Sequence, residues 1–576
     1  MFSSDTVQEL TGRFLAADGP ADSDYFGLIK ELVRHREACL PAGVERRLWQ
    51  AEIDRVYELV AEEIAHNPRS PTAPVSFGTS GWRGILGKDL CCRSVCQVTQ
   101  AIVSLYEDLD ASPELAGDLG VKSLAEARAR GCVLGYDNRF GGPVLAAAIR
   151  DWLTGQGFCV YDAGEASTGT LSAAVLRLAA AFSINLTPSH NPLEYGGFKF
   201  NAADAGPAAP SLTNRITARA RAMIAAGELR PSLPDPSRVR PCDALALWIE
   251  LVRANAHRHG LDYDGLLAGF ARQHDLVVAV DCVHGASRRH IRQLFGNPAS
   301  DRLILLRAEA DPTFGGIAPE PSAANLEPVH KALASRTERL RLGVIIDPDA
   351  DRIRFTDGRR EITMNHFGAM AYHFLHEHKG KAGMVAKTVA TSNFANAIAQ
   401  AFQEKVFEPR VGFKEFKPVL LEALVCFEES DGITVIGHTP EKDAYIGLML
   451  ALDMMLTRNQ GLGDYLAELE KAYGAFLPAR DAVTVRAAGE ELTAKLQGLT
   501  AYVPGKTIQV GNKALAIDKV ISIDGRKMVL ADGSWIMIRP SGTEPKVRFY
   551  VEARTEAGKD AMFAAAREML AATGLL

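Results

Sequence analysis

The sequence predicts an α/β protein: several similar α/β domains, a helical extension before them and an α+β domain after them. Through the middle of the chain, short apolar runs ending in polar residues alternate with segments of helical periodicity, a pattern typical of domains with mixed or largely parallel sheets. Toward the C-terminus this pattern gives way to short β runs separated by glycine turns. The 576 residues, 47% of them hydrophobic, correspond to roughly three to five domains of ordinary size.

The N-terminal segment is expected to form a helical extension. Apolar residues recur at helical spacing over 26–33 and again over 49–64. Pro68, Pro71 and Pro74 then interrupt the pattern. This segment carries no chemical motif of its own, and we expect it to pack on the first domain.

The next part of the chain reads as alternating strands and helices. Its expected strands are 132–134, 158–161 and 182–186, its expected helices are 146–153 and 172–181, and the stretch 202–241 is read as a helix and a connection. The third strand delivers Ser189 at its C-terminal end, where open α/β sheets bind ligands. The same pattern recurs at 276–280, which ends at Asp281, and at 342–346, which ends at Asp347.

The C-terminal part is expected to form an α+β domain. Its expected strands are 520–523, 528–530, 534–538 and 547–551, and its expected closing helix is 556–572. Phe563, Ala566, Met569 and Leu570 lie on one face of that helix, which should pack on the sheet.

Composition argues against several classes of protein. The net charge of −6 and the pI near 6.2, with no long stretch of one sign, argue against nucleic acid or an acidic membrane as the main partner. The nine cysteines form no CxxC pair, so we expect reduced thiols rather than zinc or disulfides. The N-terminus lacks the pattern of a signal peptide, and no apolar run reaches membrane-spanning length. A cytoplasmic protein is expected.

Ser189 is the candidate nucleophile. It lies in the run 187–192, Thr-Pro-Ser-His-Asn-Pro, where Pro188 and Pro192 fix the backbone and His190 and Asn191 tolerate a turn. A phosphorylated serine adds nearly two negative charges at neutral pH and would need a cation nearby. The alternative is a serine that only shapes the turn.

Three carboxylates form the candidate metal site. Asp347, Asp349 and Asp351 alternate directly after a strand, so the loop must curl to bring them onto one ion. Together with a phosphoryl oxygen they suit Mg²⁺, which prefers hard oxygen ligands. Arg352 would clamp a phosphate or orient a carboxylate. A solvated acidic turn is the other interpretation.

Two further loops have the composition of anion-binding sites. Residues 77–84 combine three glycines, two hydroxyls and Arg83, so that backbone N–H groups can approach an anion. Residues 539–546 combine Arg539, hydroxyls, glycine amides and Lys546, which suits a phosphate that is not transferred. A plain glycine turn and a polar hairpin loop are the respective alternatives.

Three weaker signals concern sugar binding and proton transfer. Residues 427–432 offer acceptors for sugar hydroxyls, and the runs 196–199 and 441–443 supply Lys199 and Lys442, each of which could act as acid or base. On spacing alone, surface charge is the better explanation for each of them.

Taken in this order, the motifs resemble those of the α-D-phosphohexomutase family, the phosphoglucomutases and phosphomannomutases, over about residues 75 to 552. The resemblance implies a heart-shaped arrangement of four domains, with one loop from each meeting in a central cleft, in a monomer or weak dimer. With the extension, the predicted divisions are 1–72 (extension), 73–240 (domain I, phosphoserine loop), 241–358 (domain II, metal loop), 359–475 (domain III, sugar loop) and 476–576 (domain IV, phosphate loop).

The resemblance also implies an activity, an isomerase that moves a phosphoryl group between the 1- and 6-oxygens of a hexose phosphate. Phosphorylated Ser189 would donate to the sugar, giving a hexose 1,6-bisphosphate that acts as intermediate and activator, and Mg²⁺ would neutralise charge. The implied catalytic residues are Ser189, Lys199, Arg83, Lys442 and His190, and the implied metal ligands are Ser189, Asp347, Asp349 and Asp351. The implied substrate-binding residues are Glu428, Ser430, Gly412, Lys414, Arg539, Ser541, Gly542, Thr543, Lys546 and Arg352.

The chain departs from the usual family motifs at four positions: Pro188 replaces alanine, Gly169 replaces proline, and Phe427 and Ala444 replace glycines. The last two bear on sugar specificity. Glucose phosphate is the expected substrate, with mannose phosphate or dual specificity as the alternative and glucosamine phosphate less expected. Two readings from other classes remain: a haloacid-dehalogenase-like phosphatase with Asp347 as nucleophile, and a non-catalytic sugar-phosphate-binding homologue whose extension binds a partner.

Overall fold

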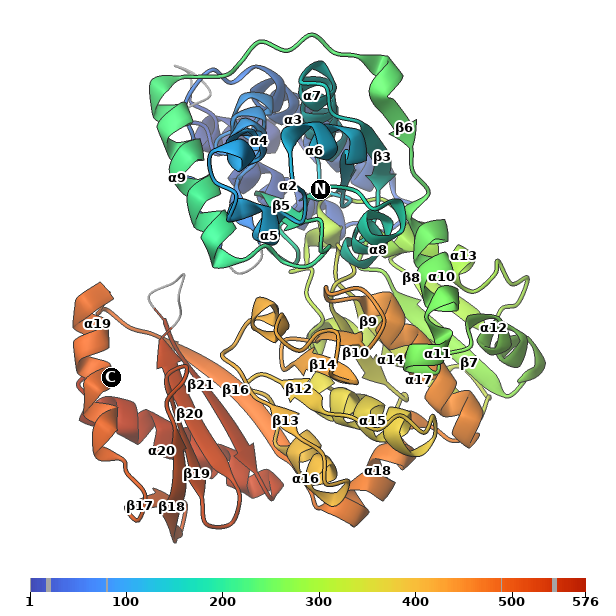
Figure 1. The fold of residues 1–576 in the computed structure, drawn as a ribbon, viewed down its shortest axis with the longest axis vertical. Coiled ribbons are helices and arrows are strands. Elements are labelled where there is room, and N and C mark those ends of the chain that lie inside the picture. The colour runs from blue at the N-terminus through green and yellow to red at the C-terminus, as the bar shows by residue number, and fades with distance from the viewer. Residues whose placement is uncertain (1, 17–21, 79–80, 488, 541–545) are drawn as a thin grey trace. The chain divides into compact units, whose positions relative to one another are not determined.

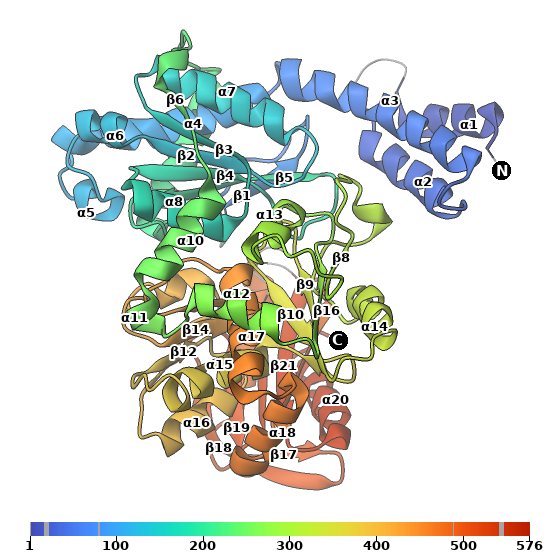
Figure 2. The ribbon, with the colours of Figure 1, turned by 90° about the vertical axis from the view of Figure 1, so that its right-hand side faces the viewer.

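The computed structural model describes residues 2–16, 22–78, 81–487, 489–540 and 546–576 (Figures 1 and 2). The chain divides into two compact units. Unit 1 comprises Met1–Glu361 and Gly437–Leu456, and unit 2 comprises Ile362–Ile436 and Thr457–Leu576. Residues 437–456 therefore lie inside the predicted third domain but pack with unit 1.

Unit 1 begins with the predicted helical extension, formed by α1 (Ser4–Phe14), α2 (Tyr25–Glu37) and α3 (Val44–His66). Ser3 and Asp24 cap the first two helices by accepting hydrogen bonds from backbone N–H groups. The apolar faces of α2 and α3 are buried in one core with the first α/β domain. In Figure 2 the three helices form a group at the N-terminal end of the ribbon.

The first sheet has the strand order β1-β5-β4-β2-β3-β6 and is mixed. β2, β3, β4 and β6 run parallel, whereas β5 is antiparallel to β4 and to β1. The strands are β1 (Trp82–Ile85), β2 (Cys132–Tyr136), β3 (Val160–Glu165), β4 (Phe182–Leu186), β5 (Tyr195–Ala202) and β6 (Val239–Pro241). The helices are α4 (Cys92–Glu107), α5 (Leu115–Leu119), α6 (Leu124–Arg130), α7 (Gly142–Gly155), α8 (Thr168–Leu178) and α9 (Pro210–Ala226).

The second sheet has the order β11-β10-β9-β7-β8 and is also mixed. β7, β8 and β9 are parallel, and β9 turns back into antiparallel β10 through the loop that carries the aspartates. The strands are β7 (Leu276–Asp281), β8 (Leu303–Leu306), β9 (Leu340–Ile346), β10 (Ile353–Thr356) and β11 (Glu361–Ile362). The helices are α10 (Ala244–Ala254), α11 (Ala256–His259), α12 (Tyr263–Arg272), α13 (Ser287–Leu294), α14 (Glu327–Ala334) and α17 (Ala444–Arg458).

Unit 2 holds two further sheets. The third, in the order β13-β12-β14-β15, is mixed, and the fourth, in the order β16-β21-β20-β19-β18-β17, pairs its strands antiparallel. The strands are β12 (Val385–Lys387), β13 (Val406–Phe407), β14 (Val425–Glu428), β15 (Gly432–Val435), β16 (Leu477–Thr484), β17 (Thr507–Val510), β18 (Lys513–Ile521), β19 (Arg526–Leu530), β20 (Trp535–Pro540) and β21 (Lys546–Ala553). The helices are α15 (Met364–Glu377), α16 (Phe394–Ala401), α18 (Leu462–Tyr473), α19 (Gly489–Leu496) and α20 (Glu556–Ala572).

The predicted fold class is confirmed: three α/β domains with mixed sheets are followed by a C-terminal domain with helix α20. Several elements were missed or displaced in the sequence analysis. α4, β1, β5, β16 and β17 were not predicted, and α8 begins at Thr168, four residues before the predicted start, because Ser167 caps it. Within the part of the chain that is described, no helix is long and apolar enough to cross a membrane.

Candidate active site

Ser189 follows β4 and is fully buried, with its backbone in the left-handed region at φ 57°. Its N–H donates to Thr187 Oγ1 at 2.9 Å, and the Thr187 hydroxyl donates to Asp137 Oδ2 at 2.6 Å. The Ser189 hydroxyl donates to Asp347 Oδ2 at 2.9 Å. The candidate nucleophile therefore lies in hydrogen-bonding contact with the first candidate metal ligand.

Arg139 binds the backbone of the serine loop, and it was not identified from the sequence. Its guanidinium donates to the backbone carbonyl oxygens of the loop and of the residues just after it. These acceptors are Ser189 (2.7 Å), Asn191, Pro192 (2.6 Å) and Tyr195 (3.2 Å). The available signal was the run 137–139, Asp-Asn-Arg, at the carboxyl end of parallel strand β2.

Asp137 and Arg139 form a buried charged pair beneath the same loop. Arg139 Nε lies 3.6 Å from Asp137 Oδ2, and both side chains are almost completely shielded. Burial raises the pKa of Asp137 to about 6, although Arg139 and the hydrogen bond from Thr187 oppose this. The pair supports the backbone of the serine loop and leaves the Ser189 hydroxyl facing the aspartates.

The three aspartates converge as the curled-loop prediction requires. The Ala350 N–H donates to the Asp347 carbonyl oxygen at 3.0 Å, and Ala350 adopts φ 51°, which turns the chain back. One carboxylate oxygen from each of Asp347, Asp349 and Asp351 lies within 4.8 Å of the others, and all three side chains are buried.

The chemistry of this donor set fits a hard divalent cation. Among the described residues, Asp349 Oδ1 and Asp351 Oδ1 accept no hydrogen bond although both are buried. Burial and the two neighbouring carboxylates raise the pKa of Asp347 well above its ordinary value. A cation bound to the three carboxylates would remove this repulsion and coordinate the two oxygens that accept no hydrogen bond.

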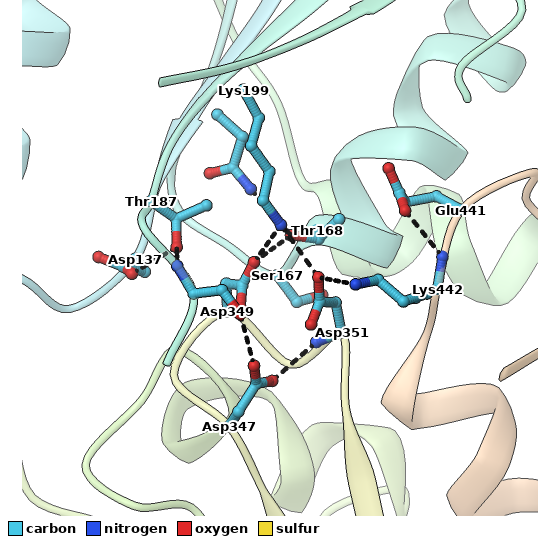
Figure 3. A network of polar contacts seen from close by, with 12 residues as sticks. Asp137, Ser167, Thr168, Thr187, Lys199, Asp347, Asp349, Asp351, Glu441 and Lys442 are labelled. Atoms are coloured by element: carbon cyan, nitrogen blue, oxygen red, sulfur yellow. Dashed lines mark hydrogen bonds and ion pairs between the residues drawn. The ribbon is translucent and has the colours of Figure 1, made fainter. Parts of the chain in front are cut away.

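Two lysines reach the aspartates from different elements (Figure 3). Lys199 of β5 places Nζ 2.6 Å from Asp349 Oδ2 and 3.0 Å from Asp351 Oδ2, and Lys442, which precedes α17, lies 3.1 Å from Asp351 Oδ2. Burial acts to lower the pKa of Lys199, but Asp349 and Asp351 outweigh it and raise the pKa above its ordinary value. For Asp351, burial opposes ionisation, but Lys199, Lys442 and Arg352 hold its pKa well below the usual range.

Two arginines add positive charge near Ser189, and His190 lies next to the serine. His190 Nδ1 lies 3.4 Å from Ser189 Oγ, and its Nε2 lies 3.4 Å from Arg352 Nη1. The charge of Arg352, then burial and Arg83, lower the pKa of His190 well below its ordinary value, so the ring is neutral at pH 7. Burial and the repulsion from Arg352 lower the pKa of Arg83. This surrounding charge suits an anionic group attached to Ser189.

Thr168 supports the metal loop from the start of α8, and the sequence analysis gave it no role. Its hydroxyl donates to Asp349 Oδ2 at 2.7 Å, its N–H donates to the Asp349 carbonyl at 2.9 Å, and Asn185 donates to its hydroxyl at 3.0 Å. The next residue, Gly169, faces a carboxylate, because a Cβ there would lie 2.4 Å from Asp443 Cγ. Glycine, rather than the family's usual proline, thus fits this close approach.

Asp443 holds Lys442 in place at the start of α17. Its Oδ1 accepts from the Tyr445 N–H at 2.8 Å, and its Oδ2 pairs with His438 Nε2 at 2.7 Å and accepts from Trp248 Nε1. The adjacent Glu441 is buried, and burial raises its pKa. Of these partners, Trp248 lies 195 residues away in the sequence, and no local pattern identifies it.

The remaining predicted site residues belong to unit 2. Ser430 donates to Glu428 Oε1 at 2.7 Å at the end of β14, and Gly412, at φ 128°, precedes the short 3₁₀ helix Phe413–Phe416 that contains Lys414. Arg539 Nε lies 3.2 Å from Asp524 Oδ1, and Lys546 begins β21.

Some predicted site residues lie outside the described residues. They are Ser541, Gly542 and Thr543 of the phosphate loop and the hydroxyls Thr79 and Ser80 of the first glycine loop.

Four family models match the chain in the order of its domains. They are the phosphoglucomutase/phosphomannomutase α/β/α domains I, II and III, at residues 74–225, 266–360 and 363–473, and the C-terminal domain of the same family, at 467–569. Together they cover most of the sequence and leave the N-terminal extension unmatched.

Similar proteins carry names from the same family. A "Probable phosphoglucosamine mutase" of Methanopyrus kandleri is 28% identical over 487 residues, covering 83% of this chain and 94% of that protein. A phosphoglucomutase/phosphomannomutase of Thermococcus kodakarensis is 26% identical over 489 residues, covering 83% and 95%. A crystal structure of a phosphoglucomutase/phosphomannomutase family protein from Burkholderia thailandensis shares the fold, with a TM-score of 0.66, 18% identity and coverage of 86% and 97%. The chain therefore belongs to the phosphoglucomutase/phosphomannomutase family, the mutases known as α-D-phosphohexomutases.

Proposed function

We propose that the protein interconverts hexose 1-phosphate and hexose 6-phosphate, with glucose phosphate as the preferred substrate, through phosphorylated Ser189 and a hexose 1,6-bisphosphate. The observation that carries the proposal is the contact between the Ser189 hydroxyl and Asp347, 2.9 Å apart, beside two more buried carboxylates. A phosphoryl group on this serine would be flanked by the aspartates and by His190, Arg352 and Arg83.

Charge neutralisation is the main catalytic contribution that this arrangement offers. Asp347, Asp349 and Asp351 would hold Mg²⁺ together with a phosphoryl oxygen, and the metal would neutralise charge on the group in transfer. Arg139 fixes the backbone that carries Ser189, and Thr168 fixes Asp349. Positioning of this kind accounts for a large part of the rate in phosphoryl transfer.

Proton movement accompanies each transfer. When the phosphoryl group leaves for a sugar hydroxyl, the P–Oγ bond of Ser189 breaks and its oxygen takes up one proton, which restores the hydroxyl that donates to Asp347. The sugar hydroxyl releases one proton for the one taken up at Ser189, so the transfer is balanced. The attacking hydroxyl loses its proton as the new P–O bond forms. We assign that proton to Lys199, which pairs with Asp349 and Asp351. A cation bound to these aspartates would share their negative charge, so they would stabilise the protonated lysine less, and neutral Lys199 would be available to accept a proton.

The choice of sugar rests on Lys442 and on the family resemblance. Lys442 is buried beside Asp351 and matches the position of a second catalytic lysine in some glucose-specific relatives. Mannose phosphate, or use of both sugars, is the alternative, and glucosamine phosphate is less favoured. The names of similar proteins include all three sugars.

A coupled assay comparing kcat/KM for glucose 1-phosphate, mannose 1-phosphate and glucosamine 1-phosphate tests the choice of sugar. Mapping the phosphorylated peptide tests the mechanism, and we expect phosphate on Ser189. Phosphate on Asp347 with none on Ser189 would instead support a haloacid-dehalogenase-like phosphatase. A lack of turnover with all three sugars, even with hexose 1,6-bisphosphate and Mg²⁺ present, would support a non-catalytic homologue.

A further inference from the structure

The N-terminal extension lies outside the residues that match the family models, which begin at residue 74. Its helices nevertheless contact the segments that hold the serine loop. We propose that the extension positions the loop of Ser189 by bracing Arg139, and that Arg36 is the positioning residue that links the two. This inference rests on the proposed role of Ser189 as phosphoryl carrier.

Arg139 also packs against one aromatic ring, that of Phe314. Its guanidinium carbon lies 4.9 Å from the ring centre of Phe314, which is fully buried in a one-turn 3₁₀ helix, Phe314–Gly316. Phe314 adopts φ 54°, a conformation that a bulky side chain rarely takes and that its surroundings must enforce. The position of this turn therefore contributes to the position of Arg139, together with Asp137 and the backbone carbonyls that Arg139 binds.

Asp311 organises that turn. Its Oδ1 accepts from the Thr313 N–H at 2.8 Å, and its Oδ2 accepts from the Gly315 N–H at 3.1 Å. These side-chain hydrogen bonds add to the backbone bonds of the turn and support the left-handed conformation of Phe314. Asp311 is also the residue of this turn that pairs with Arg36 of the extension.

Arg36 makes that contact from α2. Its side chain is only 5% exposed, and Nη2 lies 3.1 Å from Asp311 Oδ2 and donates to Thr313 Oγ1 at 2.8 Å. The other donors of its guanidinium bond Gln50 and Glu37 within the extension. Arg36 thus connects the helices of the extension directly to the turn that carries Phe314.

Two more contacts join the extension to the same region. The ring of Tyr57 in α3 lies 4.3 Å from that of Phe140, the residue after Arg139. Lys30 of α2 pairs at 2.7 Å with Glu194, which lies two residues beyond Pro192 of the serine loop. The extension therefore touches the support of the loop at three separate points.

The contact between Arg36 and Asp311 is polar and largely buried, which favours a positioning role over non-specific packing of the extension. A buried arginine costs free energy unless it is paired and hydrogen-bonded, and apolar packing alone could hold two helices against a domain. The extension already has such an apolar core, to which Trp49, Ile53 and Val56 contribute. The planar guanidinium of Arg36 binds Asp311 in one orientation and so fixes its position. Through Asp311 it also affects the positions of Phe314 and Arg139.

Arg36→Met in the full-length protein tests the link, with Trp49→Leu as the matched control. Trp49 stacks on His35 and contacts Phe2, so its loss weakens the extension without touching Asp311. For Arg36→Met we expect kcat to fall about tenfold with KM unchanged, because the serine is displaced while the substrate contacts remain. We also expect faster hydrogen–deuterium exchange in the peptide spanning residues 187–195. Trp49→Leu should lower Tm but leave both readouts unchanged.

Two results would overturn the proposal. One is unchanged exchange and kcat in Arg36→Met. The other is an equal change in both variants, which would reveal general destabilisation rather than a specific link. The exchange readout does not require turnover, so it decides the positioning role even if the proposed mutase activity fails. If Arg36→Met does not fold, Arg36→Lys, which keeps the charge but loses the fork, carries the same comparison with a smaller expected change.

Discussion

At the scale of single residues, Ser189 owes its position to neighbours on other elements more than to its own turn. A non-glycine residue at φ 57° costs on the order of 1 kcal/mol in an isolated chain. Here Thr187 accepts its N–H and Arg139 donates to its carbonyl oxygen, so the surroundings offset that cost. The hydroxyl is thereby held toward Asp347.

Replacing Ser189 with alanine should remove turnover while the fold is retained. Alanine fits the same buried space but has no oxygen to carry the phosphoryl group, so we expect kcat to fall by more than about 1,000-fold. Steady-state kinetics measure the loss, and circular dichroism checks the fold. Ser172→Ala is the matched control, because Ser172 is also buried in the first domain but bonds the Ala205 carbonyl. Activity of Ser189→Ala within tenfold of wild type would refute the carrier assignment.

Arg539→Ala should chiefly raise KM. The family resemblance assigns Arg539 to the phosphate that is not transferred, and loss of one charge-assisted hydrogen bond is worth roughly 1.5–3 kcal/mol, or about 10- to 150-fold. The exposed Arg548 lies on the neighbouring strand and provides the control Arg548→Ala, which should behave as wild type. A fall in kcat with KM unchanged would argue against the assigned role.

The chemistry of the site could be predicted from sequence where the reacting groups lie within short runs. Ser189 and the three aspartates are of this kind, and the structure places them together. The supporting roles of Arg139, Thr168 and Asp443 were not predicted, because each bonds at least one partner remote in sequence. Arg139 bonds carbonyls about 50 residues away, and Thr168 bonds an aspartate 181 residues away.

At the scale of elements, two lysines and one glutamate form a buried network between the third and fourth sheets, within unit 2. Glu408 lies 3.0 Å from Lys387 Nζ of β12 and 3.3 Å from Lys527 Nζ of β19. Burial opposes ionisation of Glu408, but the two lysines lower its pKa to about 2. Burial, and then the repulsion from Lys387, lower the pKa of Lys527 to about 7.

Lys527 should make the stability of unit 2 increase with pH. Between about pH 7 and pH 10 the unfolded chain holds a proton on this lysine that the folded chain has released, so raising the pH favours the folded state. We expect wild type to gain up to about 1.4 kcal/mol per pH unit relative to Lys527→Met over this range. Urea denaturation at several pH values measures the difference. The exposed Lys519→Met provides the control, and parallel pH profiles for wild type and Lys527→Met would contradict the expectation.

Elements with strong local patterns were predicted well, and those that depend on distant pairing were not. β4 and α20 have the predicted bounds. β16 was missed because its exposed and half-buried positions give little apolar signal, and its conformation comes from pairing with β21 along its whole length. β5 was missed for a related reason, because its two glycines weaken the pattern of side chains by which a strand is recognised in a sequence.

At the scale of the whole molecule, the chain returns to unit 1 after entering unit 2. Residues 437–456, which carry Lys442, pack with the unit that contains Ser189 and the aspartates. Such a return could not be predicted, because the sequence of α17 is apolar on all sides and does not indicate its neighbours. The repeated α/β pattern, in contrast, followed from the order of strands and helices, and the division into four domains was implied by the family resemblance.

Because the candidate metal site lies wholly within unit 1, Mg²⁺ should stabilise that unit selectively. A ligand at 100 times its Kd adds about 2.7 kcal/mol to the unit that binds it. Of the five tryptophans only Trp535 lies in unit 2, so the fluorescence of Trp535→Phe reports on unit 1. We expect Mg²⁺ to raise the Tm of this signal relative to a sample with chelator. Asp349→Asn should abolish the Mg²⁺-dependent shift, whatever its own Tm, because it removes a ligand. A shift that persists in Asp349→Asn, or a calorimetric shift confined to unit 2, would place the cation elsewhere.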